Sequence, residues 1–244
     1  MEEIKKTKEI EKGKNILLIA VMFLAAVLLW NTPLLYPVKL FVVALHELSH
    51  GLMAIIVGGK IANIQIDYRI GGYCAYYLPL SAGFFSKSLV AAAGYLGSML
   101  WGASIFILSS RSQRDRWITL SIGFIMLVLA FFVIKTGQLF GIVFCFAFAA
   151  FLFAAYKWLP AGFHDVFLKF LGLTSCLYVI IDIKEDLIDR SGIGSDADRI
   201  AELVGAPSLS VPIGVAWIVL AVVVLFFTFK FAYPAEDPTR VGGQ

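Results

Sequence analysis

Charged residues are scarce in this sequence. Asp, Glu, Lys and Arg together make up 15% of the 244 residues, and 60% of the residues are hydrophobic. A soluble domain is normally about a quarter charged and close to half apolar. The 21 Phe and nine Tyr would promote aggregation in water, whereas lipid accommodates them. The composition therefore argues against a soluble domain and favours a membrane protein, with spans of about 20 residues each.

Cysteine is also rare. The three cysteines, Cys74, Cys145 and Cys176, are odd in number and widely spaced, and two of them lie in apolar runs. We interpret them as small buried hydrophobes and not as a disulfide framework. The net charge of +3 is distributed in short clusters between apolar runs. This pattern is typical of loops at a membrane surface and gives no indication of nucleic-acid binding.

The apolar runs predict an all-α membrane protein with about six to seven transmembrane helices. The first run, Ile16–Trp30, is followed by Asn31-Thr32-Pro33 and not by a small-residue cleavage site, so we expect a retained span and not a signal peptide. The expected organisation is one polytopic domain with a charged N-terminal tail at 1–14, a polar loop at 184–210 and a C-terminal tail at 233–244. The candidate spans are about 15–31, 34–58, 87–109, 115–134, 138–157, 163–188 and 211–232.

The orientation in the membrane follows less directly. The positive-inside rule places the five lysines of the N-terminus in the cytoplasm. With seven spans, Arg111, Arg114 and Arg116 then lie on the opposite side, which the rule disfavours. A re-entrant segment near 61–86 would change this count, so the sequence leaves the orientation open.

A segment after the second span breaks the helical pattern. From Asn63 to Arg69 polar and apolar residues alternate, which is typical of a strand. Gly71-Gly72 is a turn signal, and the aromatic-rich segment 73–77 follows it. We predict a β-hairpin at 61–80, with an ordinary interfacial loop as the alternative. Because lipid does not tolerate open strand edges, the hairpin must lie at the interface or against helices.

The third span opens with small residues. Gly94, Gly97 and Ser98 recur at helical spacing in Ala-Ala-Ala-Gly-Tyr-Leu-Gly-Ser. Small side chains let two membrane helices approach closely. We expect these three residues to form a helix-packing face.

The strongest chemical signal is His46-Glu47-Leu48-Ser49-His50 in the second span. On a helix, His46 and His50 project from one face about a turn apart, which suits two imidazole ligands of one zinc ion. Glu47 reaches the same neighbourhood and can act as the general base for a zinc-bound water. Ionisable residues inside a membrane span are costly, so they indicate a functional site. A buried polar cluster that only bridges helices is the structural alternative.

A zinc site needs a third protein ligand. Asp182 is our first candidate, because spans two and six run in the same direction and His50 and Asp182 lie at comparable depth. Asp186, one turn later, is the rival. We interpret His164 instead as an interfacial residue at the start of a helix.

The polar loop contains a second set of carboxylates. Ser195 and Asp198 have the spacing of a helix N-cap and its box partner, which predicts a short helix from Asp196 to about Val204 that ends near Gly205. A carboxylate of Asp196 or Asp198 reaching the zinc is a less supported alternative.

With these motifs, residues 34–110 and 175–205 resemble the site-2 protease family of intramembrane zinc metalloproteases. The resemblance implies packed membrane helices around one zinc ion, and hydrolysis of peptide bonds within or next to transmembrane segments of membrane-protein substrates. It assigns His46, His50 and Asp182 as ligands and Glu47 as the base. A substrate strand would pair with an edge of the hairpin.

The sequence also departs from the family pattern. Asp182 precedes Ile183, where the family has an Asp-Gly pair in a proline-containing run, and no loop is long enough for a PDZ-like insertion. The chain is therefore most similar to the short bacterial branch, which implies a multi-pass protein of a prokaryotic plasma membrane.

Two other functions are compatible with the residues. A non-catalytic zinc-stabilised scaffold that binds a partner helix would keep the ligands without needing Glu47. A transporter is the second alternative, and the absence of a visible internal repeat argues against it.

Overall fold

The computed structural model describes residues 2–185 and 194–233, and it is mostly helical with one two-stranded antiparallel sheet. Within these residues, six helices are long and apolar enough to cross a membrane. Both findings confirm the predicted fold class. The elements in chain order are α1 (Glu2–Leu28), α2 (Tyr36–Ile56), β1 (Lys60–Asp67), β2 (Gly71–Tyr77), α3 (Phe84–Arg111), α4 (Asp115–Val133), η1 (Ile134–Thr136), α5 (Leu139–Trp158), α6 (Ala161–Lys184), α7 (Asp196–Val204), η3 (Pro207–Leu209) and α8 (Ser210–Ala232).

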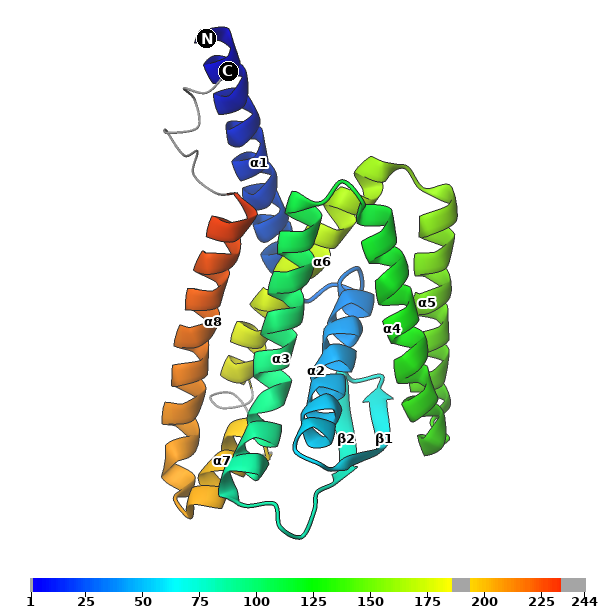
Figure 1. The fold of residues 1–244 in the computed structure, drawn as a ribbon, viewed down its shortest axis with the longest axis vertical. Coiled ribbons are helices and arrows are strands. Elements are labelled where there is room, and N and C mark those ends of the chain that lie inside the picture. The colour runs from blue at the N-terminus through cyan, green and yellow to red at the C-terminus, as the bar shows by residue number, and fades with distance from the viewer. Residues whose placement is uncertain (1, 186–193, 234–244) are drawn as a thin grey trace.

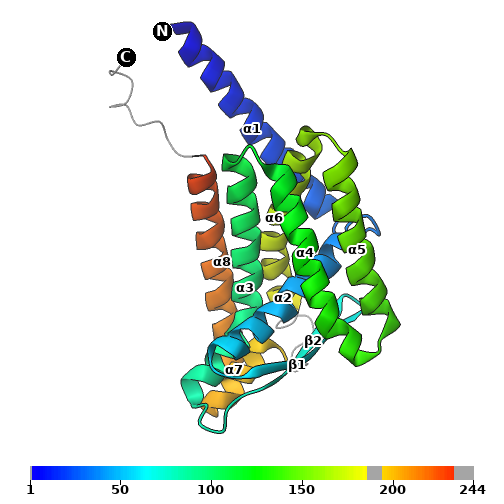
Figure 2. The ribbon, with the colours of Figure 1, turned by 45° about the vertical axis from the view of Figure 1, so that its right-hand side comes forward.

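The first predicted span does not cross the bundle by itself. The apolar part of α1 is Ile16–Leu28, and at 1.5 Å per residue it is about 20 Å long, shorter than a hydrocarbon core of about 30 Å. Figures 1 and 2 show α1 and then α2 both leading away from the N-terminal end of the bundle, at an angle to each other. The two helices therefore traverse the bundle once together, and the separate crossing expected at 15–31 is wrong.

This arrangement changes the expected topology. The loop between α3 and α4, which carries Arg114, lies at the same end of the bundle as the start of α1 (Figure 1). The seven-span count had separated the N-terminal lysines from this loop. The conflict with the positive-inside rule therefore disappears, because both basic segments face the same side.

The hairpin forms as predicted, with different details. Its strands pair in antiparallel register with Ile64 opposite Cys74. The turn is formed by residues 68–70, where Ile70 has a φ of 62°, a conformation that is strained for a β-branched residue. The sequence predicted the turn at Gly71 and Gly72. In the structure these two glycines are the first residues of β2.

The hairpin lies against α2 and is not an open sheet in lipid. Ile64, Ile66 and Cys74 are buried in the same hydrophobic core as the central residues of α2. At the turn, the Tyr36 hydroxyl donates a hydrogen bond to the carbonyl of Tyr68 (2.6 Å). The sheet is thereby fixed along α2, from the first turn of the helix to its end.

Helix α2 is the centre of the fold, with 14 buried residues among its 21. Helices α3 and α6 cross closely beside it. Their backbones approach at Gly102 and Gly172, since a Cβ on Gly102 would lie 2.8 Å from the carbonyl oxygen of Gly172. On the other side, α4 and α5 form an antiparallel pair (Figure 1). Their connection turns at Gly137, which has a φ of 68°.

Candidate metal centre

Two imidazoles meet on one face of α2. The Nε2 atoms of His46 and His50 are 3.2 Å apart, as their four-residue spacing predicted. The His50 side chain is almost fully buried, and Glu47 between them is buried as well. The Nδ1 atom of His50 lies 2.7 Å from the carbonyl oxygen of Val90. Since a carbonyl can only accept, Nδ1 carries a proton, and Nε2 is the ring nitrogen that faces the site.

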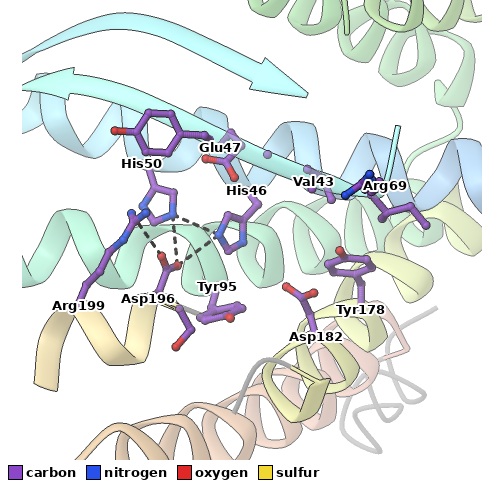
Figure 3. A pocket seen from close by; sticks show the side chains of 16 residues that line it. Val43, His46, Glu47, His50, Arg69, Tyr95, Tyr178, Asp182, Asp196 and Arg199 are labelled. Atoms are coloured by element: carbon purple, nitrogen blue, oxygen red, sulfur yellow. Dashed lines mark hydrogen bonds and ion pairs between the residues drawn. The ribbon is translucent and has the colours of Figure 1, made fainter. Parts of the chain in front are cut away.

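The third member of the group is Asp196, the first residue of α7. Its Oδ2 atom lies 3.3 Å from Nε2 of His46 and 3.2 Å from Nε2 of His50. Among the described residues, His46, His50 and Asp196 are the only His, Cys, Asp or Glu set of three or more whose ligand atoms all lie within 4.8 Å of one another. Figure 3 shows the carboxylate directed at both rings.

A capping box holds Asp196 in place. The Ser195 side chain accepts a hydrogen bond from the Asp198 backbone N–H, and the Asp198 carboxylate accepts one from the Ser195 N–H. The Ser210 hydroxyl also donates to Asp198, which joins the start of α7 to α8. Helix α7 ends at Gly205 in the left-handed conformation. The predicted cap and both predicted ends of this helix are confirmed.

The donor set fits a tetrahedral zinc ion. Zinc lies about 2.0–2.2 Å from nitrogen and oxygen ligands, and tetrahedral geometry then separates the ligands by about 3.3–3.6 Å. The three separations among His46 Nε2, His50 Nε2 and Asp196 Oδ2 are 3.2, 3.2 and 3.3 Å. In addition, Oδ2 of Asp196 is buried and makes no hydrogen bond of good geometry with a described residue. Three protein ligands leave a fourth position for water or substrate.

The electrostatics keep Asp196 ionised. Burial alone would raise the pKa of this carboxyl, but the adjacent His50 and His46 outweigh it and hold the pKa well below its ordinary value. Arg199, one turn further along α7, lies 3.9 Å from the second carboxylate oxygen. These neighbours therefore favour the ionised form of Asp196, which is the form that binds a metal.

Glycines let the surrounding backbone approach the centre. A Cβ on Gly94 of α3 would collide with the Nε2 atoms of both histidines, and one on Gly97 would collide with Ser49. The Ser98 hydroxyl donates to the Gly94 carbonyl (2.9 Å), and the Ser98 carbonyl accepts from α6. The predicted packing face of α3 is confirmed, and it packs directly under the candidate ligands.

The hairpin covers Glu47 in a similar way. A Cβ on Gly72 would lie 2.6 Å from Cγ and 2.7 Å from Oε1 of Glu47. Because Gly72 has no side chain, β2 can pass directly over the carboxylate. The sequence had suggested only a turn for this residue.

A cavity of about 290 Å³ opens beside these residues. Its lining includes side chains that carried no functional signal in the sequence, among them Val43, Arg69, Tyr95, Tyr178 and Arg199. Tyr95 lies edge-on to His46, with ring centroids 5.1 Å apart, and Trp217 of α8 packs behind it. The two arginines are on the hairpin turn and on α7, so the rim of the cavity is basic (Figure 3).

The other expected ligands lie in different places. Asp182 lines the cavity, and Figure 3 shows its carboxylate directed inward, but it does not join the three-ligand group. Asp186 lies outside the described residues. His164 is buried in α6, with Nδ1 2.9 Å from the Thr119 hydroxyl of α4, and it is not part of the group.

The comparisons with known proteins give one match. A model of the family described as Peptidase M50B-like matches residues 19–228. No curated protein and no solved structure matches the chain. The matched region contains every element from the second half of α1 to most of α8.

Proposed function

The chain belongs to the Peptidase M50B-like family, and on this basis we propose that it is an intramembrane zinc metalloprotease of the site-2 type. Its substrates are membrane proteins, cleaved within or next to a transmembrane segment. The single observation that supports this proposal most is the triangle of His46, His50 and Asp196 beside a buried Glu47. The proposed location is the plasma membrane of a prokaryote.

In this proposal, His46, His50 and Asp196 hold the metal. A zinc ion there would supply a Lewis acid that lowers the pKa of a bound water toward neutrality. Asp182 was the ligand expected from the sequence, and the ligand-atom distances favour Asp196 instead. Asp182 lines the same cavity, so exchanging each aspartate for asparagine separates the two assignments.

Glu47 acts as the general base. Its carboxylate accepts a proton from the attacking water and delivers it to the departing amide nitrogen as the C–N bond breaks. The water oxygen is added to the carbonyl carbon, so the products are a carboxylate and an amine. Because Gly72 packs on Glu47, the strand β2 holds the base in one position.

The substrate lies along β2 in an extended form. Gly71, Gly72 and Tyr73 line the cavity, so a strand added to this edge passes the metal with its peptide bonds exposed. Arg69 and Arg199 on the rim are placed to attract substrate carbonyls or acidic side chains.

The test is cleavage by the purified protein in liposomes with a panel of single-span membrane proteins. Glu47→Gln should keep the metal and lose at least about 100-fold in cleavage rate, the usual contribution of a general base. Glu202→Gln, an exposed change on α7, is the matched control and should cleave normally. Undiminished cleavage by Glu47→Gln would reject the base assignment, and no cleavage by the wild type would favour a scaffold.

A further inference from the structure

A second pocket lies at the end of the bundle opposite the hairpin and α7. It has a volume of about 360 Å³ and forms where the α3–α4 loop, the start of α4 and the end of α5 meet (Figures 1 and 2). Neither the metal centre nor the cavity beside it shares a residue with this pocket. The side chains that matter here are Arg114, Asp115, Arg116, Trp117, Tyr156 and Lys157.

One wall of the pocket is held rigidly. The Arg116 guanidinium donates to the Tyr156 carbonyl from Nε (3.1 Å) and Nη2 (2.5 Å), and Nη2 also lies 3.5 Å from the Lys157 carbonyl. These carbonyls belong to the last turn of α5, which has no further helical N–H to pair with. The guanidinium thereby offsets the negative end of the α5 dipole. Trp117 packs on Tyr156 with ring centroids 5.5 Å apart.

The pocket lining has an excess of positive charge. Its lining carries three positive charges and the one negative charge of Asp115, which gives 3 − 1 = +2. Arg114 and Lys157 are exposed, and neither makes an ion pair with a described residue. One oxygen of Asp115 is buried, so this carboxylate is partly withdrawn from the mouth. The net positive charge of the lining favours an anionic ligand.

The position favours a lipid over a soluble anion. The pocket lies where the apolar spans of α4 and α5 begin and end, and exposed Trp117 and Trp158 mark this level as the membrane interface. Below it, α4 exposes large apolar side chains such as Phe124 and Val128. An anion bound here therefore has a surface for acyl chains directly beneath it.

We propose that this pocket binds the phosphate-bearing headgroup of an anionic phospholipid. Arg114 and Lys157 contact the phosphate, and Trp117 packs on the region that joins the headgroup to the acyl chains. Arg116 forms the fixed positive wall. The site is independent of the metal centre and of proteolysis.

The test measures lipid retained by the detergent-purified full chain in native mass spectrometry. Phosphatidylglycerol should bind saturably, about one per chain, in preference to phosphatidylcholine. Each Lys or Arg near an anionic lipid contributes about a fivefold gain in affinity. Arg114→Gln/Lys157→Gln should therefore weaken phosphatidylglycerol binding by about 30-fold. Arg116 is left unchanged, because it also caps α5.

The matched control is Lys60→Gln/Lys87→Gln, which removes the same charge from exposed residues of β1 and α3. It should leave phosphatidylglycerol binding unchanged. Thermal unfolding in detergent micelles that contain phosphatidylcholine and no phosphatidylglycerol should be the same for both double variants, which checks that they are folded. An equal loss of binding in the control, no preference for phosphatidylglycerol, or full competition by millimolar glycerol phosphate would each overturn the proposal.

Discussion

Replacing Gly94 by Ala adds one methyl group directly under the two imidazoles. The new Cβ would overlap Nε2 of both His46 and His50, and neither ring can withdraw freely. His50 is fixed through Nδ1 by the Val90 carbonyl, and His46 packs edge-on against Tyr95. The α3 backbone or the ligand nitrogens must therefore move.

Overpacking of a dense site by one methyl group costs about 1–3 kcal/mol. If the added methyl group displaces the ligand nitrogens, zinc affinity falls by about 5- to 140-fold, since 1.4 kcal/mol is a factor of ten. Competition with a zinc-sensitive chelator in detergent measures this change. The helix itself is not weakened, because alanine is a better helix former than glycine.

Gly162→Ala in α6 is the matched control, because a Cβ there meets nothing within 4 Å. This variant should bind zinc like the wild type and change stability by no more than about 0.5 kcal/mol. If Gly94→Ala bound zinc with wild-type affinity, the metal would not lie where the two Nε2 atoms meet, and the reasoning would be refuted.

Two further predictions concern the elements around the centre. Ser195→Ala removes the acceptor of the capping box and should cost about 0.5–2 kcal/mol of α7 stability, with a weaker zinc affinity in the same chelator assay. Glu202→Ala on the exposed face of α7 should change neither the stability nor the zinc affinity. An equal effect of the two variants would contradict a role for the cap. Burial, aided by Glu47, raises the pKa of the Cys74 thiol to about 12, and all three cysteines are buried. N-ethylmaleimide at pH 8 should therefore modify none of them in the native protein and all three after denaturation, and rapid native labelling of Cys74 would contradict the packing of β2.

The local parts of the site could be predicted from the sequence. The spacing of His46 and His50 sets the meeting of their rings, because both lie on one helix. The same holds for α7, whose ends are determined by Ser195, Asp198 and Gly205 within ten residues of one another. Alternation of residue types also predicted the hairpin.

The long-range parts could not be predicted. Ser195 and Asp198 predict a helix that starts at Asp196, but nothing in their pattern says that this start docks on α2. Asp182 matched in depth along parallel helices, yet depth alone does not determine which carboxylate reaches the rings. From its local sequence, Gly72 resembled a turn residue. Its close approach to Glu47 could not be foreseen, because that contact depends on tertiary packing. Hydropathy likewise detected the apolar part of α1 without showing that α1 and α2 share one crossing.

The most direct test of the account is zinc per chain, measured by elemental analysis of protein purified without chelators. We expect about one zinc in the wild type and in Asp182→Asn, and none in Asp196→Asn or in His46→Ala/His50→Ala. Full zinc in Asp196→Asn together with its loss in Asp182→Asn would contradict the assignment made from the ligand distances. Absence of zinc from the wild type as well would contradict the metal centre itself.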